Sequence, residues 1–234
     1  MRATGCLIGA ACLLGACAAP GPVIADGFAE PREQVDILVM PPDIDMGLMT
    51  LSGTQSREEW DRRAAHHLMA ALIAQLEAGG EDVHTLGSGG HDSEDLRQLY
   101  LLHRAIMQAV LVHEVEIDTA RFAGPLPHRP EGRYDYTLGE AATRLAGETP
   151  ADYAVFLTSR ARLESGGMLV SKLLVGAVTG QAPPGHGFRG TLVSLVDLGT
   201  GRLVWLGASD GGDARDPQAA AKIMKRIFRH SPLD

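Results

Sequence analysis

The stretch TLVSLVDLGTGRLVWL, residues 191–206, indicates the fold type more clearly than any other part of the chain. Two apolar runs, Thr191–Asp197 and Arg202–Leu206, flank the segment Leu198–Gly201, which contains two glycines. Val- and Leu-rich runs on both sides of a short glycine-containing segment are typical of a β-hairpin. We therefore expect two antiparallel strands here.

Strand patterns also occur earlier in the chain. Val35–Met40 is a run of apolar residues ended by Pro41 and Pro42, which interrupt strand pairing. Residues 151–162 predict a buried strand, and Glu81–Leu86 predicts a short one. These segments supply the remaining strands of a sheet.

Helices alternate with these strands. The clearest one has an apolar residue at every fourth position and ends at Gly79–Gly80. Its stripe consists of Trp60, Ala64, Leu68, Leu72 and Leu76. Ser56 and Glu59 have the spacing of a capping box at its start, and Thr137 and Glu140 repeat that spacing before a short helix that reaches Ala146.

Three further helices are predicted. One begins after Asp92 or Ser93 and places His103 on its apolar face, where a structural histidine is expected. Residues 110–117 could continue this helix or form a strand. Met168–Val178 predicts a buried helix, and Asp216–Pro217 opens the last one.

This order of elements predicts an α/β fold. We expect a single domain in which a mixed β-sheet is covered by helices, with a C-terminal β-hairpin followed by a helix. The domain is expected to span residues 34–234. It has the length to bury one core.

The first residues predict an export signal. Arg2 precedes a short apolar run, and Leu14-Gly15-Ala16-Cys17 matches the lipobox of bacterial lipoproteins at every position. Resemblance to that class implies removal of residues 1–16, lipidation of Cys17 and attachment to a membrane. An ordinary secretory signal cut near Ala19 is the alternative. Residues 17–33, rich in Pro, Gly and Ala, are expected to be a flexible tether.

The chain is acidic. It carries 21 Lys and Arg against 29 Asp and Glu, a net charge of −8. This balance argues against binding to nucleic acid and against electrostatic attachment to anionic lipid. The three cysteines all lie within the first 17 residues, so no disulfide is expected in the domain.

Two groups of residues carry a resemblance to known families. Val35–Pro42, the capped helix and the segment 195–205 together resemble envelope lipoproteins of the TolB amino-terminal, CsgG and PelC type. Residues 134–139 and 151–154 are similar to uncharacterised proteobacterial lipoproteins. The resemblance implies a role in assembly, transport or wall maintenance through protein contacts, and it implies no catalytic residues.

The segment 43–55 is the candidate contact surface. We expect it to be a loop with an unusual share of apolar side chains, which cost solubility unless they are buried. These are Ile44, Met46, Leu48, Met49 and Leu51. They either fold over the sheet as a lid on the core or bind a partner protein or a second copy of the chain.

Reactive patterns are weak. Gly185–Gly190 has the letters of a dinucleotide fingerprint but leads into a predicted strand, so a loop is expected. No histidine spacing suits a metal. We expect no cofactor, no metal and no enzymatic activity. The alternative is an envelope hydrolase or metal-dependent enzyme that uses His84, His91 and the carboxylates of residues 114–118.

The sequence thus predicts a periplasm-facing lipoprotein, attached to the outer membrane through Cys17, that serves as a non-enzymatic interaction or assembly component of the cell envelope. The residue after Cys17 is Ala18. An aspartate at that position is an inner-membrane retention signal in enterobacteria, so its absence favours the outer membrane.

Overall fold

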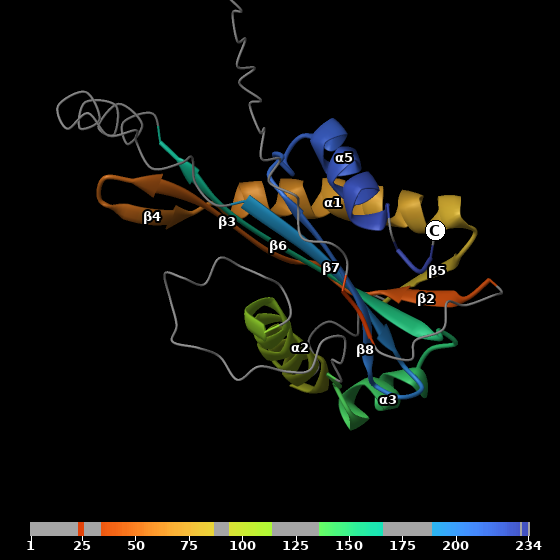
Figure 1. Cartoon of the computed structure of the whole chain (residues 1–234). Coiled ribbons are helices and arrows are strands. Elements are labelled where there is room, and N and C mark those ends of the chain that lie inside the picture. Colours follow the sequence, from red (N-terminus) through yellow and green to blue (C-terminus); the bar gives the residue numbers. More distant parts are fainter. Residues whose placement is uncertain are drawn as a thin grey trace, which may run out of the picture.

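The structure is a computed structural model that describes residues 23–25, 34–86, 94–113, 136–165, 189–229 and 231–233. These residues form one mixed sheet with helices on both faces (Figure 1), which confirms the expected fold class. The strands are β1 (Val23–Ile24), β2 (Asp36–Val39), β3 (Asp43–Thr50), β4 (Gly53–Ser56), β5 (Asp82–Thr85), β6 (Tyr153–Glu164), β7 (Arg189–Asp197) and β8 (Leu203–Asp210). The helices are α1 (Glu58–Gly79), α2 (Glu94–His113), α3 (Glu140–Ala146) and α5 (Pro217–Phe228).

The long strand β6 organises the sheet, whose order is β1-β8-β7-β6-β2-β5. One edge of β6 pairs antiparallel with β7. Its other edge pairs in parallel with β2 near its start and with β3 further along. Pro41 and Pro42 separate these two partners, because proline has no N–H to donate to a ladder. β2 and β3 therefore lie end to end along the same edge of β6.

The predicted hairpin is confirmed. β7 and β8 pair antiparallel around the turn, and β8 continues to Asp210, beyond the predicted end of the strand. The outer edge of β8 is occupied by β1, where Val23 pairs with Leu206 and Ile24 with Trp205. These residues fall inside the range expected to be a tether, so the sheet includes part of that range.

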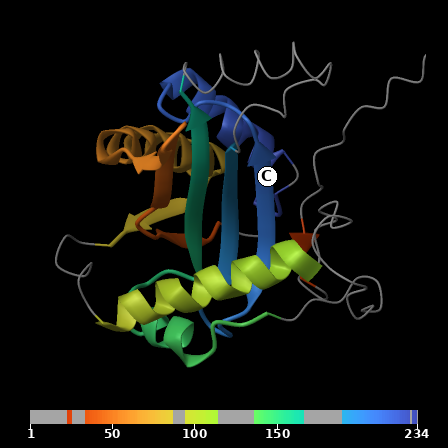
Figure 2. The same cartoon turned by 90° about the vertical axis from the view of Figure 1, so that its left-hand side faces the viewer.

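The helices form two layers (Figures 1 and 2). α1 and α5 cover one face of the sheet, and the predicted stripe of α1 is buried there. α2 and α3 lie on the other face, where Leu99, Met107 and Val110 belong to a second core that also contains Phe156. Residues 110–113 continue the helix, and α2 ends at His113. Residues 114–117 lie outside the described ranges, so their helix or strand assignment stays open. None of the described helices is long and apolar enough to cross a membrane.

The two predicted capping boxes are wrong. α1 begins after Arg57 with no side-chain cap, because Ser56 is the last residue of β4 and Glu59 pairs with Arg63 at 2.9 Å. α3 begins after Gly139. Thr137 Oγ1 instead accepts from the N–H of Gly139 and donates to the carbonyl of Gly201.

The cap of α5 is confirmed. Asp216 accepts a hydrogen bond from the N–H of Ala219 at 2.7 Å, and Pro217 occupies the first turn. The αL conformation of Gly80 ends α1 as predicted. Local sequence patterns therefore predicted the described helices. The first residues of α1 and α3 depend instead on contacts with distant parts of the chain.

The expectation that residues 43–55 form a loop is wrong. This segment forms β3, a turn and β4. Its first half alternates charged and apolar residues, Asp43-Ile44-Asp45-Met46, which is the pattern of a half-buried strand. The adjacent prolines and Gly47 masked that signal.

Several sequence predictions concern residues outside the described ranges. These are the signal at 1–16, Cys17, the carboxylates of residues 114–118 and the helix at 168–178, together with His91 and Gly185–Phe188 of the dinucleotide-like motif. They remain predictions. Arg189 and Gly190, which end that motif, begin β7.

Gly207 permits the close packing of α5 on β8. A Cβ atom at this position would lie 2.6 Å from Cζ2 of Trp205 and 2.7 Å from Cγ2 of Ile227, both fully buried or nearly so. Overpacking of this kind costs about 1–3 kcal/mol. We expect Gly207→Ala to lower the free energy of unfolding by about 2 kcal/mol in a urea titration.

Gly199→Ala is the matched control for that substitution. Gly199 is exposed in the hairpin turn, and an added Cβ would meet only Oδ1 of Asp197, at 3.3 Å. Its effect should stay within about 0.5 kcal/mol. Equal effects of the two substitutions would show that α5 does not require the glycine.

Candidate functional site

The sheet extends past its helical layers in a feature that we call the arm. The arm consists of Gly47–Thr50 of β3, all of β4, and Arg162–Glu164 of β6. Figure 1 shows it projecting beyond the start of α1. Among the described residues, this part of β6 pairs with β3 alone, because the ladder with β7 ends at Ala161.

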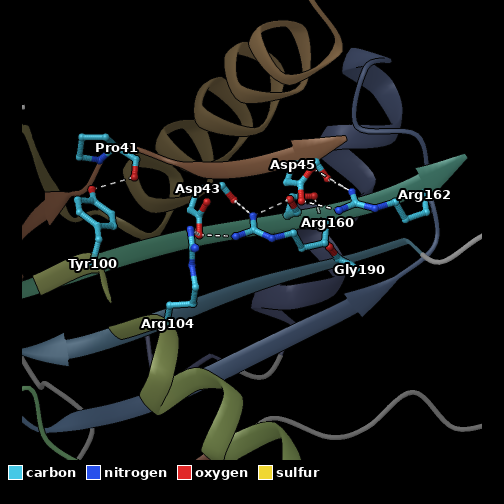
Figure 3. Close-up of polar contacts among 9 residues, drawn as sticks. Pro41, Asp43, Asp45, Tyr100, Arg104, Arg160, Arg162 and Gly190 are labelled. Atoms are coloured by element: carbon cyan, nitrogen blue, oxygen red, sulfur yellow. Dashed lines mark hydrogen bonds and ion pairs between the residues drawn. The ribbon is translucent and has the colours of Figure 1, made fainter. Parts of the chain in front are cut away.

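A row of ion pairs joins β3 to β6 at the base of the arm (Figure 3). The guanidinium of Arg162 contacts both carboxylate oxygens of Asp45, at 3.0 and 2.6 Å. The guanidinium of Arg160 binds the carboxylate of Asp43 at 2.5 Å and its carbonyl at 2.8 Å. Paired guanidinium and carboxylate groups form the strongest hydrogen bonds available to side chains.

α2 is tied to the same row. Arg104 donates to the carboxylate of Asp43 at 2.9 Å, and the hydroxyl of Tyr100 donates to the carbonyl of Pro41 at 2.9 Å (Figure 3). These contacts fix the end of β2 and the beginning of β3 against the helix. The row therefore positions the arm relative to both layers.

Gly47 makes the ladder geometry possible. In the register of β3 and β6, Gly47 lies opposite Arg162. A Cβ at Gly47 would be 3.2 Å from Cδ of Arg162 and 2.8 Å from Cγ2 of Thr54. The missing side chain lets Arg162 lie across the strand and reach Asp45.

The arginines of this row lower the pKa values of both carboxyl groups. Burial acts to raise the pKa of Asp43, but hydrogen bonds and charges from Arg160 and Arg104 outweigh it and lower the pKa. The hydrogen bond from Arg162 lowers the pKa of Asp45. Both groups are therefore ionised and paired at neutral pH. This arrangement holds the strands together and provides no free acid or base.

The predicted contact residues do not share one surface. Met46 is 2% exposed and lies in the core under α1, and Ile44 packs against the same core. Leu48 and Met49 are half-buried in the arm. Leu51 lies in the turn between β3 and β4 and is 73% exposed. Ile44 and Met46 are thus buried as part of the sheet itself and not as a lid folded over it, and the contact role of the segment stays a prediction.

β4 is the feature that the sequence did not indicate. All four of its residues are exposed, and within the described chain β4 pairs only with β3. The N–H of Arg57 donates to the carbonyl of Met46, so Gln55 also faces β3 in the ladder. By alternation, the backbone N–H and C=O of Thr54 and Ser56 point outward. Such an edge can accept another strand.

The residues of the enzymatic alternative are only partly described. His84 on β5 hydrogen-bonds to the carboxylate of Asp36 on β2 at 2.7 Å, with both side chains over one-third exposed. His91 and residues 114–118 lie outside the described ranges. In the part of the chain that the structure describes, no three His, Cys, Asp or Glu side chains are grouped to hold a metal.

Comparisons with known proteins give structural neighbours only. No protein-family model and no curated protein matches the chain. A PelC dodecamer from Paraburkholderia phytofirmans is similar, with 15% identity over 92% of this chain and 96% of that one and a TM-score of 0.39. Lipoprotein GNA1162 from Neisseria meningitidis is 12% identical over 76% and 79% of the two chains, with a TM-score of 0.32.

The C-terminal domain of LpoB from Salmonella enterica is 13% identical over 80% of this chain and 87% of that one, with a TM-score of 0.31. PelC is one of the families that the sequence itself resembles. Similarity at this level carries no argument about what this chain binds. The function must therefore be argued from its own residues.

Proposed function

We propose that this chain is a lipid-anchored protein of the bacterial cell envelope that works by binding other proteins and catalyses no reaction. Its anchor is Cys17, exposed as the first residue of the mature protein when residues 1–16 are removed and then acylated. The sequence Leu14-Gly15-Ala16-Cys17 behind a short apolar run carries this proposal. The domain faces the periplasm from the outer membrane, in keeping with Ala18.

The arm is the proposed contact surface. It offers an exposed edge strand, with the 73% exposed side chain of Leu51 at its turn. β4 carries no charged residue and no proline, the two devices that usually block an edge strand. An extended segment of a partner protein can add to this edge through backbone hydrogen bonds. The ion pairs at the base keep the edge in place.

Mass spectrometry of the mature N-terminus tests the anchor. The protein should be extracted from membranes with detergent and digested, and the N-terminal peptide should begin at Cys17 and carry a diacylglyceryl group. An unmodified N-terminus, or one that begins near Ala19, would contradict the proposed anchor.

Proline at position 54 tests the arm. A photo-crosslinking amino acid at Leu51 should yield a specific adduct in intact cells. Thr54→Pro removes an outward N–H without removing a bond to β3, so the fold should be kept and the adduct reduced at least about tenfold, the effect of losing about 1.4 kcal/mol. Immunoblotting measures the adduct.

Thr54→Val is the matched control, because it keeps the N–H and the branched shape that contacts Gly47. The adduct should persist in this variant. An adduct of twice the monomer mass would identify a second copy as the occupant of the edge. An adduct that survives Thr54→Pro undiminished would refute strand addition.

A further inference from the structure

β1 joins the sheet only six residues after Cys17. Ile24 pairs with Trp205, and the N–H of Ala25 donates to the carbonyl of Val204 at 2.9 Å. Ala25 is 4% exposed and belongs to the core beneath α2. The edge of the sheet is thus built from residues that directly follow the proposed anchor.

This pairing limits how far the domain can lie from the anchor. The six steps from Cys17 to Val23 span at most about 20 Å when fully extended. If the first fixed point were Gln34, where the chain next enters the described domain, the same limit would be about 60 Å. β1 therefore shortens the connection to the membrane roughly threefold.

The position of β1 in the sheet also bears on how the domain is oriented relative to the membrane. The sheet order places β1 at one end and β5 at the other, and Figure 2 shows the two strands on opposite sides. Five strand spacings of about 4.8 Å separate them by about 24 Å. This separation is larger than the maximal length of the connection from Cys17 to β1.

Electrostatic attraction would not produce this orientation. The chain has a net charge of −8, and anionic leaflets attract basic segments instead. A domain on a long tether would have no preferred edge toward the lipid. The short connection at β1 imposes one.

We propose that β1 holds the β1–β8 edge of the sheet against the membrane surface and directs the β5 edge away from it. This proposal rests on the proposed lipidation of Cys17. The partner of the β1–β8 edge is the bilayer to which the chain is anchored, and the short connection is what brings them together.

Energy transfer in reconstituted vesicles tests the orientation. The full-length lipidated protein is placed in phosphatidylethanolamine and phosphatidylglycerol vesicles that contain an acceptor-labelled lipid. A single donor dye is attached at Asp210→Cys, four residues beyond the Leu206 partner of Val23, or at Thr85→Cys on β5; both positions are exposed. Transfer should be clearly greater from position 210 than from position 85.

Two insertions isolate the role of β1. A Gly/Ser insert of roughly ten residues between Gly21 and Pro22 lengthens the connection before β1, so the difference between the two dyes should shrink. The same insert between Ala29 and Glu30 follows β1 and should leave the difference unchanged. If both inserts act alike, β1 does not hold the domain.

The outcomes separate this inference from the function on which it rests. Protein that floats with the vesicles but gives equal transfer from both positions overturns the orientation and leaves the anchor intact. Protein that does not float with the vesicles overturns the anchor, and the orientation is lost with it.

Discussion

Replacing Cys17 with alanine is expected to release the protein from the membrane almost completely. Each methylene of an acyl chain contributes about 0.8 kcal/mol of membrane affinity, so two or more chains anchor a protein stably. Alanine provides no sulfur for the thioether. The acidic domain offers no electrostatic replacement at anionic lipid. We therefore expect the proposed anchor to account for nearly all of the membrane binding.

Cell fractionation measures this effect. After an alkaline wash, wild-type protein should remain in the pellet, and the Cys17→Ala variant should be found in the supernatant. The apolar run from Cys6 to Leu14 is far shorter than the about 20 residues needed to span a bilayer, so an uncleaved signal should not hold the variant after the wash. Cys12→Ala lies in the same run and should stay in the pellet. A Cys17→Ala protein that pellets like wild type would disprove the anchor.

Acidification should destabilise the domain through His103. This side chain is 4% exposed, hydrogen-bonds to Ser194 at 2.7 Å and stacks on Phe156 with ring centroids 4.1 Å apart. Burial lowers its pKa to about 4 from 6.5, and the nearby carboxylate of Asp43 offsets only part of this shift. His103 is therefore neutral in the folded protein at pH 5, where the unfolded chain binds a proton.

The sign of the effect follows from that difference in proton binding. Because the folded pKa lies below the unfolded one, stability is highest above about pH 6.5 and falls as the pH drops toward 4. The loss should be about 2 kcal/mol at pH 5 and about 3 kcal/mol once the pH reaches the folded pKa. Urea titrations at pH 7.5 and pH 5 measure it.

Two variants identify the residue responsible. His103→Gln can still hydrogen-bond to Ser194 but does not titrate, so its stability should change about 2 kcal/mol less between the two pH values. His66→Gln, on the exposed side of α1, should behave like wild type. If His103→Gln keeps the full pH dependence, the acid sensitivity originates elsewhere.

Local patterns predicted the helices and the hairpin well. The stripe of α1, the cap of α5 and the hairpin β7–β8 all depend on residues a few positions apart, so their signals are contained in short windows. His103 was correctly expected to be structural because it shares a helix face with apolar residues. The capping boxes failed because Ser56 and Thr137 had bonding partners or strand roles that short windows do not contain.

The candidate site depends on long-range pairing. Asp43 and Arg160 are 117 positions apart, and neither position by itself predicts a partner. The apolar content of residues 43–55 suggested a contact surface, but the structure divides the five apolar residues between core, arm and turn, because β3 pairs with β6. The edge of β4, which carries the proposed contact, has no charged and no large apolar residue, and it gave no signal in the sequence.

The amino-acid order alone predicted an export signal with a lipidation site, the four helices that the structure describes and the last two strands, because peptidase recognition, helical periodicity and tight turns are properties of neighbouring residues. The tertiary structure alone decided that β6 has two parallel partners, that β4 pairs only with β3 among the described strands, and that β1 forms one end of the sheet. Hydrogen bonds between strands have little local sequence preference, and a strand finds its partner through the burial and register of the whole sheet.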